Sequence, residues 1–263
     1  MNIVVCVKYV PDATGDRRFE ADNTVDRVGV DGLLSELDEY AVEQALQLKE
    51  GGDDPDNTVV TVVTVGPDNA ADAIRKALQM GADKGVHVVD DQIAGSDALS
   101  TSLVLAEAIK KLPHDLIVCG MASTDAGTSV VPAMLAERLG LPGVTFGSEV
   151  DLAGDKITIK RDGDVATDTI EGTLPLVLSV TDQSGEARYP SFKGIMAAKK
   201  KPVDTFSLAD LGVSADQVGL SAAWTAVEST EARPPRTAGQ IVKDEDGSGA
   251  KALVEFLASK KFI

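Results

Sequence analysis

The sequence has few of the residues on which metal sites and disulfides depend. Its 263 residues include two cysteines and two histidines. Cys6 and Cys119 lie inside β-branched runs, so we expect buried, reduced thiols of a cytoplasmic protein rather than a disulfide or a redox pair. With only His87 and His114 beside them, no spacing resembles a zinc site. We therefore expect no metal.

Positive charge is also scarce. The chain has 25 Lys and Arg against 42 Asp and Glu, a net charge of −17. A nucleic-acid surface requires concentrated positive charge, so we expect no nucleic-acid partner. No apolar run reaches the ~20 residues of a bilayer span, and the apolar residues 1–10 lack the basic start of a signal peptide. We expect a strand there, and no direct membrane insertion.

Familiar catalytic and nucleotide motifs are absent as well. No G-x-G-x-x-G follows an expected strand, and neither G-x-x-x-x-G-K-[ST] nor G-x-S-x-G occurs. Neither histidine has an evident nucleophile partner, which gives hydrolysis by a triad little support. We expect no catalytic residues.

The first half of the chain alternates between apolar runs and helical periods. The apolar runs predict buried strands at residues 3–7, 58–65, 86–89 and 116–119. Helical spacing predicts helices over residues 37–48, 68–80, 97–112 and 128–139. Ser35 is a candidate N-cap of the first helix. This order predicts an α/β fold with a doubly wound, mostly parallel sheet.

The second half has a different pattern. Antiparallel strands are expected over residues 144–152, 156–161 and 165–171, with turns at 153–155 and 162–164. Residues 174–181 (LPLVLSVT) are expected to return to the main sheet. Beyond Pro202 the sequence is irregular, with a break at Pro234-Pro235, before a final helix over residues 249–260. We interpret residues 202–263 as a C-terminal arm that binds another chain.

One loop combines the features of a ligand site. In open α/β sheets ligands bind beyond the carboxyl ends of the strands, where residues 8–13, 65–67, 90–95 and 120–129 are expected. The last of these, GMASTDAGTS, has glycines, hydroxyls and an acid just before a helix, a combination suited to a phosphate. The other interpretation is a connecting loop in which Thr128 or Ser129 caps the helix. The pattern alone favours neither.

A basic stretch interrupts the acidic sequence at residues 188–202. Its lysines, Lys199 to Lys201, follow the apolar residues Phe192, Ile195 and Met196. Apolar residues ringed by charge are typical of a partner-binding surface. The alternative is a solvated basic helix end, which the periodicity alone slightly favours.

Taken together, these segments resemble the beta subunit of an electron transfer flavoprotein, over nearly the whole chain. The resemblance rests on VCVKYVPD, DEYAVEQALQLKE, VVTVGP, IRKALQMGAD, VPAMLAERLGLPGVTF, LPLVLSVTD, RYPSFKGIMAAKKKP and PPRTAG, in this order. It implies a Rossmann-like fold of the adenine nucleotide alpha-hydrolase type, with a nucleotide-binding domain at residues 1–201. The arm at 202–263 would contact the partner subunit.

The resemblance also implies a function. A bacterial, cytoplasmic heterodimer is expected, in which an alpha subunit holds most of one FAD and this chain binds a structural AMP. The chain would be an electron carrier subunit rather than an enzyme. It would accept electrons from flavin dehydrogenases, such as the acyl-CoA dehydrogenases of fatty acid oxidation, and pass them toward a membrane quinone oxidoreductase.

Site residues follow from the matching positions. The implied AMP site comprises Cys6, Ser35, Glu36, Leu37, Asp38, Val65, Gly120, Met121, Ala122, Ser123, Thr124, Asp125, Ala126, Gly127, Thr128, Ser129, Val130 and Val131. Ala13 and Leu37 match positions near the flavin. The implied docking residues, within the docking segment at 188–202, are Tyr189, Phe192, Ile195, Met196, Lys199, Lys200 and Lys201.

Two alternatives stay open from the sequence. One is a stand-alone adenine-nucleotide-binding α/β protein, either a sensor or a relative of hydrolases. The other is an electron-bifurcating relative with a second FAD in place of AMP. The number of flavins in each heterodimer distinguishes them from the leading hypothesis.

Overall fold

The computed structural model describes residues 1–15, 17–231, 234, 239, 241–244 and 247–263. The chain divides into two units, Met1–Glu228 and Ser229–Ile263. Residues 202–228, which the sequence assigned to the arm, lie in the first unit. The break expected at Pro234-Pro235 falls largely outside the described residues.

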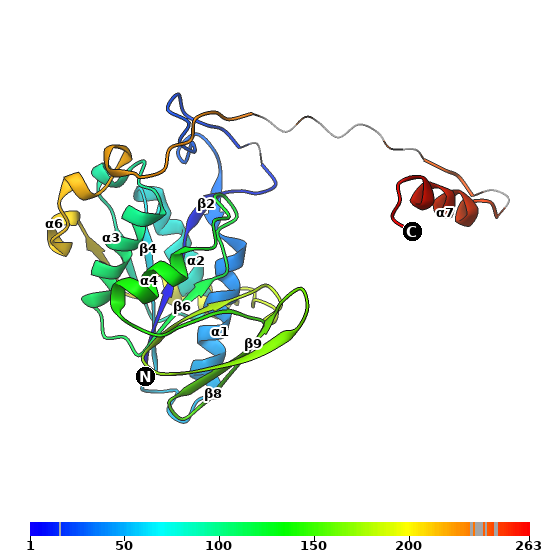
Figure 1. Cartoon of the computed structure of the whole chain (residues 1–263). Coiled ribbons are helices and arrows are strands. Elements are labelled where there is room, and N and C mark those ends of the chain that lie inside the picture. Colours follow the sequence, from blue (N-terminus) through cyan, green and yellow to red (C-terminus); the bar gives the residue numbers. More distant parts are fainter. Residues whose placement is uncertain (16, 232–233, 235–238, 240, 245–246) are drawn as a thin grey trace. The chain divides into compact units, whose positions relative to one another are not determined.

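A parallel sheet forms the centre of the first unit (Figure 1). Within the described residues it has the strand order β12-β5-β4-β1-β6-β11-β7. Its strands are β1 (Asn2–Cys6), β4 (Val59–Val65), β5 (Lys84–Val88), β6 (Leu116–Gly120), β7 (Gly143–Gly147), β11 (Leu176–Val180) and β12 (Val203–Phe206). The central strands are buried on both faces, as their continuous apolar runs predict. The doubly wound α/β prediction is confirmed.

Helices cover both faces of this sheet. One apolar core joins it to α1 (Glu36–Gly51) and α2 (Ala71–Met80), and a second joins its other side to α3 (Ala98–Lys110) and α4 (Val131–Leu139). Short 3-10 turns, η1 (Asp68–Ala70) and η2 (Asp91–Ile93), follow β4 and β5. The four predicted helices exist, but α4 begins at Val131 rather than at Thr128.

The predicted hairpin region is a separate antiparallel sheet. It comprises β8 (Glu149–Ala153), β9 (Lys156–Asp162) and β10 (Thr167–Thr173). The single strand expected over residues 144–152 is wrong, because β7 belongs to the main sheet and lies parallel to β11. Phe146, with φ at 64°, redirects the chain between the two sheets. A left-handed phenylalanine has no sequence signature.

A hairpin near the start of the chain was not predicted. β2 (Tyr9–Pro11) pairs with β3 (Gly32–Leu34), and two arginines of the long connection between them, Arg17 and Arg27, contact the loop at the carboxyl edge of the sheet. This connection places arginines near the candidate site.

The segment after Pro202 belongs to the first unit. β12 pairs with β5 at the sheet edge, and α6 (Leu208–Leu211) follows it. Leu208, Leu211, Val213 and Val218 are buried in the second core. The short edge strand VDTF is too polar to be recognised as a strand, which explains the misplaced boundary.

The second unit contains α7 (Gly249–Ser259), close to the predicted helix over residues 249–260. None of its residues is buried, and Leu253, Val254 and Phe256 are about half exposed. Across the described part of the chain, no helix combines the length and apolar character that a membrane crossing requires.

Candidate functional site

The strand order places a candidate site at the carboxyl edge of the sheet. β1 lies between β4 and β6, and the chain builds outward from it in both directions. Ligands bind to sheets of this kind where the strand order reverses. Cys6 ends β1, Val65 ends β4 and Gly120 ends β6, so three predicted site residues lie along this edge.

Close packing joins the edge loop, residues 120–129, to the start of α1. A Cβ atom on Gly120 would lie 2.6 Å from Asp38 Oδ1 and 2.7 Å from the Leu37 carbonyl oxygen, so glycine is required there. The N–H of Thr124 donates to Ser35 Oγ at 3.4 Å. Ser35 occupies the N-cap position of α1, but its hydroxyl makes no capping bond. The side-chain cap expected from the sequence is therefore wrong, since this hydroxyl faces the loop.

Asp125 anchors the edge loop with two ion pairs. Its carboxylate accepts from Lys8 Nζ at 2.9 Å and from an Arg27 guanidinium nitrogen at 2.6 Å, and its side chain is 3% exposed. Burial would raise the pKa of Asp125, but Lys8, a hydrogen bond from Ser123 and Arg27 outweigh it and hold that pKa well below its usual range. Asp125 therefore orders the loop as an anion, and two cations surround it.

Asp38 lies at the same edge, but its pKa is shifted in the opposite direction to that of Asp125. Burial raises the pKa of its carboxyl to about 7, although the N–H groups of Lys8 and Gly120 donate to it. The Lys8 N–H reaches Asp38 Oδ2 at 2.8 Å. No side chain forms an ion pair with Asp38 among the described residues. One carboxyl at this edge is thus held ionised, while the other is close to half protonated at neutral pH.

The backbone of the edge loop has N–H groups of two kinds. The N–H of Ala126 donates to Asp125 Oδ1 at 2.7 Å, and that of Gly127 donates to the Ser123 carbonyl at 3.1 Å. These two groups are occupied. The phosphate interaction that the sequence suggests for the loop at residues 120–129 is therefore open only to the later part of the loop.

Further along the loop the N–H groups are free. No described residue accepts a hydrogen bond from the N–H of Thr128, Ser129, Val130 or Val131. The last of these opens α4, whose N-terminus has no side-chain cap, so capping by Thr128 or Ser129 is not what this loop provides. Gly127 and Ser129 have φ values of 62° and 57°, which turn the backbone so that successive N–H groups can converge.

Two arginines from the connection between β2 and β3 complete the site. Arg17 donates to the Thr124 carbonyl at 2.7 Å, and Arg27 donates to the Tyr9 carbonyl at 3.2 Å in addition to its pair with Asp125. These two arginines and Lys8 were not among the predicted site residues. A cluster of arginines in an acidic chain was the available signal, but pairs about a hundred residues apart leave no local pattern.

These groups have the chemistry of an anion site. Free N–H groups at the start of a nine-residue helix attract a phosphate, and Lys8 and Arg27 offset the Asp125 charge. Thr124 Oγ1 is a buried hydroxyl without a partner among the described residues. Such a group suits a ligand with hydroxyl or phosphate oxygens. The residues present therefore fit a nucleotide.

The other predicted residues of this edge make fewer contacts. Cys6 ends β1, Cys119 is the penultimate residue of the neighbouring strand β6, and both thiols are buried. The hydrogen bond between the two thiols, together with burial, raises the pKa of Cys119 well above its usual range. Glu36 and Ala13 are exposed, while Leu37, Val65, Met121 and Ala122 are half-buried.

The docking segment presents apolar side chains to solvent. It contains α5 (Phe192–Ala198), which Ser191 caps by accepting from the Gly194 N–H at 3.0 Å. Tyr189 is 92% exposed and Phe192 is 81% exposed. Ile195 and Met196 are exposed to a smaller extent. Lys199 and Lys200 are exposed as well.

Lys201 differs from the other two lysines. Its Nζ donates to the Leu78 carbonyl at 2.9 Å, near the end of α2, and burial lowers its pKa. Lys201 is therefore not part of a solvated basic helix end. A lysine that binds a helix carbonyl holds the segment in place.

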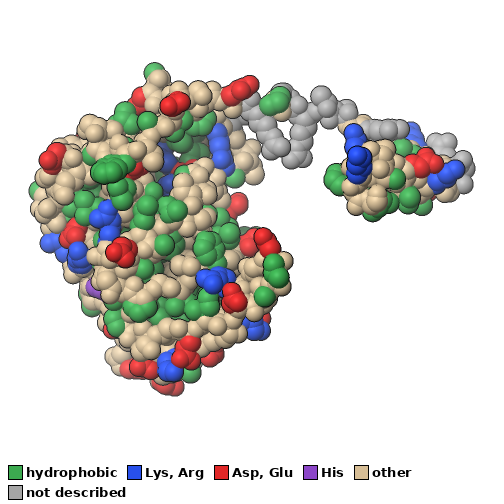
Figure 2. All heavy atoms as spheres, viewed as in Figure 1, with side chains coloured by type: hydrophobic (Ala, Val, Ile, Leu, Met, Phe, Trp, Pro, Cys, Tyr) green, Lys and Arg blue, Asp and Glu red, His purple; other side chains and the backbone are tan. Residues whose placement is uncertain are grey.

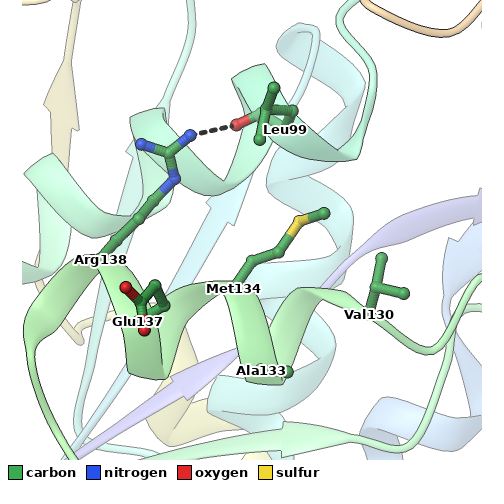
Figure 3. Close-up of a pocket in the computed structure, with 6 residues that line it drawn as sticks. All are labelled: Leu99, Val130, Ala133, Met134, Glu137 and Arg138. Atoms are coloured by element: carbon green, nitrogen blue, oxygen red, sulfur yellow. Dashed lines mark hydrogen bonds between the residues drawn. The ribbon is translucent and has the colours of Figure 1, made fainter.

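A surface hollow of about 460 Å³ lies between α3 and α4 (Figure 3). Leu99, Val130 and Met134 line it, and Arg138 donates to the Leu99 carbonyl at 2.9 Å. Figure 2 shows apolar side chains on the face that carries α4. Glu137 and Arg138 also line the hollow, beside its apolar residues.

The fold defines a class, an α/β protein with a doubly wound parallel sheet and a glycine-containing loop at its switch point. The model of the electron transfer flavoprotein domain matches residues 22–211. Electron transfer flavoprotein subunit beta of Mycobacterium tuberculosis strain H37Rv is 46% identical, covering 100% of this chain and 99% of that protein.

More distant relatives bear the same name. The proteins of Syntrophomonas wolfei and Megasphaera elsdenii are 39% and 33% identical, and they cover 98% and 99% of this chain and 96% and 97% of their own lengths. The chain therefore belongs to the electron transfer flavoprotein beta subunit family. It is an electron carrier rather than an enzyme, as the sequence predicted.

Proposed function

We propose that this chain forms a heterodimer with an alpha subunit that holds most of one FAD. In the cytoplasm, the complex accepts electrons from flavin dehydrogenases, such as acyl-CoA dehydrogenases, and passes them to a membrane quinone oxidoreductase. The observation that carries this proposal is the match to named beta subunits over the full chain. When bound, the flavin supplies the electron chemistry, and the protein supplies binding and orientation.

The carboxyl edge is proposed to hold AMP. Its phosphate would accept from the free N–H groups of Thr128 to Val131, while Lys8 and Arg27 offset the charge of Asp125. A ribose hydroxyl is the proposed partner of the buried Thr124 hydroxyl. AMP therefore has a structural role, because it joins the edge loop to α1. Ala13 and Leu37 are proposed to lie near the flavin.

The second unit is proposed to bind the alpha subunit. Its helix α7 has apolar residues with no cover in the described part of its own unit, and Phe262 and Ile263 beyond it are each 72% exposed. Exposed apolar surface of this kind is typical of a partner interface. Expressed without its partner, the chain is expected to be poorly soluble or to lack FAD.

The docking segment is proposed to receive the dehydrogenases, with Phe192 as the apolar anchor. Burying a phenylalanine side chain contributes about 1.5–3 kcal/mol of transfer free energy. Phe192→Ala should therefore weaken electron transfer from the donor at every ionic strength.

One preparation tests the heterodimer and its nucleotides. The chain is co-expressed with the alpha subunit encoded by the same organism, and the purified complex is denatured so that released nucleotides can be identified by mass spectrometry. One FAD and one AMP in each heterodimer are expected. Two FAD molecules and no AMP in each heterodimer would mean that a second flavin occupies the proposed AMP site. A colourless homo-oligomer that does not bind the alpha subunit would contradict the proposal.

A variant locates the AMP phosphate. Thr128→Pro removes one free N–H, so AMP should be lost while FAD stays bound. The matched control is Thr128→Ala, which keeps the N–H and should therefore retain AMP. Equal AMP content in the proline and alanine variants would move the phosphate elsewhere.

A further inference from the structure

Arg188, at the start of the docking segment, bonds to two glutamates of α1. Its Nε donates to Glu43 Oε2 at 2.7 Å, and its backbone N–H donates to the same oxygen at 3.1 Å. One guanidinium nitrogen reaches Glu50 Oε1 at 2.6 Å, and the other bridges both glutamates at 3.0 and 2.9 Å. Planar, multidentate contacts of this kind fix direction as well as distance.

The ion pair with Glu43 is largely removed from water. The Glu43 side chain is 6% exposed and that of Arg188 is 32% exposed. Burial would raise the pKa of Glu43, but hydrogen bonds from Arg188 and Gln47 outweigh it and lower that pKa. The two glutamates raise the pKa of Arg188, so its charge is permanent. At neutral pH the contact is therefore fully ionised.

Other contacts hold the docking segment along its length. Gln44, also on α1, donates to the Ser184 carbonyl at 2.6 Å just before the segment. In α5, a Cβ atom on Gly194 would lie 2.4 Å from the Gln79 carbonyl oxygen, so the backbones of α5 and α2 are in close contact. Lys201 closes the segment on the Leu78 carbonyl. Each end of α5 is thus tied to the body of the protein.

A helix of seven residues has little stability of its own. Its direction is therefore set by these contacts. They leave Tyr189 and Phe192 almost fully exposed, because Gly194, Ala198 and Lys201 are the residues of the segment that face the protein. A surface that is already ordered loses less conformational entropy when a partner binds it.

We propose that Arg188 is a positioning residue that holds the docking helix in its binding-competent orientation through Glu43 and Glu50. This inference rests on the proposed docking function of the segment. Arg188 acts through Phe192, so its effect on donor binding requires that side chain. The lysines of the segment, in contrast, act through long-range charge.

A double-mutant cycle tests this coupling in the complete FAD-loaded heterodimer, with a purified acyl-CoA dehydrogenase, reduced by its acyl-CoA substrate, as the probe. Arg188→Gln is expected to raise KM for the heterodimer about tenfold and to change kcat less than about twofold. In a Phe192→Ala background the same change should raise KM less than about twofold. Arg161→Gln, on the exposed hairpin, removes the same charge and should change neither constant.

Two further variants guard against misfolding and simple charge effects. Glu50→Gln leaves the buried Glu43 contact in place and should give a smaller KM increase of the same kind. Arg188→Lys keeps the charge but not the planar contacts, so it should restore KM only in part. Hydrogen exchange of amides 189–200 should accelerate in Arg188→Gln and stay unchanged in Arg161→Gln.

The outcomes separate the two proposals. If Phe192→Ala leaves KM unchanged, the docking function itself is wrong. Suppose instead that Phe192→Ala raises KM, and that Arg188→Gln changes KM by the same factor with Phe192 and with Ala at that position. The docking function then stands, and the positioning role is overturned. Full rescue by Arg188→Lys would also overturn it, because charge alone would then account for the effect.

Discussion

The edge loop and the docking segment are both held by ion pairs, but the carboxylate lies in the edge loop in the first case and outside the docking segment in the second. Each is held by one buried carboxylate, Asp125 in the loop and Glu43 for the segment. Asp125 belongs to the loop, and its cations are Lys8 from the connection between β1 and β2 and Arg27 from the connection between β2 and β3. Glu43 belongs to the helix beneath the segment, and the cation, Arg188, belongs to the segment.

This difference decides which groups remain free. In the edge loop the side-chain charges bond with one another, so backbone N–H groups are left for an anion. In the docking segment the charge contacts lie beneath the chain, so apolar side chains are left for a protein. A buried ion pair contributes little net stability, and its position specifies the local structure instead.

The largest expected effect separates the two regions by pH. Asp38 at the edge has a pKa of about 7, above its unfolded value, so between about pH 4 and 7 the folded state binds the extra proton. Its contribution to the unfolding free energy therefore falls as pH rises, by on the order of 3 kcal/mol from pH 5 to pH 8. Glu43 has a lowered pKa, so its contribution is lost only as pH falls below its usual range.

Urea unfolding of the chain and of Asp38→Asn, from about pH 5 to pH 8, measures this term. The difference between the two unfolding free energies should change with pH in the stated direction, while Glu43→Gln should show no such slope in this window. Parallel curves for the chain and Asp38→Asn would mean that Asp38 titrates normally.

The next effect concerns the anchor of the edge loop. Asp125→Ala leaves Lys8 and Arg27 without their shared partner, and it should lower the unfolding free energy by about 2 kcal/mol. The value lies below that for a fully buried pair because both cations remain partly exposed to water. Urea unfolding at neutral pH measures it, and AMP content should fall in parallel.

Asp168→Ala is the matched control for that substitution. It removes an exposed carboxylate that lies 3.5 Å from Arg161, a surface pair worth about 0.5 kcal/mol or less. Equal losses in the two variants would remove the distinction between an ordering carboxylate and a solvated one.

A smaller effect is expected where α5 meets α2. Gly194→Ala places a methyl group against the Gln79 carbonyl and should displace the docking helix, at a cost of about 1 kcal/mol in stability. KM for the dehydrogenase should rise as well. Gly51→Ala, where no atom lies within 4 Å of the added carbon, should be neutral or slightly stabilising. Equal changes in the thermal unfolding of the two variants would mean that the contact between Gly194 and the Gln79 carbonyl does not limit the size of the side chain at position 194.

The core of the fold could be predicted from the sequence because its signals are local. Strand β4 is a continuous β-branched run, β6 begins with an apolar run, and α2 has one apolar face. β12 was missed because an edge strand is partly polar, and the end of β7 was missed because Phe146 turns there without glycine. Local patterns therefore identify buried elements better than edges and redirections.

The candidate site was predictable in its backbone but not in its charges. The glycines and hydroxyls of residues 120–129 mark the loop, yet Arg17 and Arg27 reach it from about a hundred residues away. The lysines of the docking segment were equally unpredictable, because Lys201 donates to a carbonyl of α2 while Lys199 and Lys200, with the same side chain, are exposed. The position of the Leu78 carbonyl, near the end of α2, determines which lysine it binds, and the sequence of the docking segment contains no information on that position.

The smallest expected effect uses this difference among the lysines. Lys199→Gln with Lys200→Gln should slow association with the dehydrogenase by about two- to fivefold at low salt, and the effect should vanish near 0.5 M salt because screening shortens the reach of exposed charge. Lys201→Gln should lose about 1 kcal/mol of stability at any salt, since its bond to Leu78 is local. Stopped-flow reduction of the flavin over a salt series, with urea unfolding of each variant, separates the two roles. A salt-dependent rate effect for Lys201→Gln without a stability loss would place all three lysines on the same solvated surface, and only the Arg188 side of the docking helix would then be fixed.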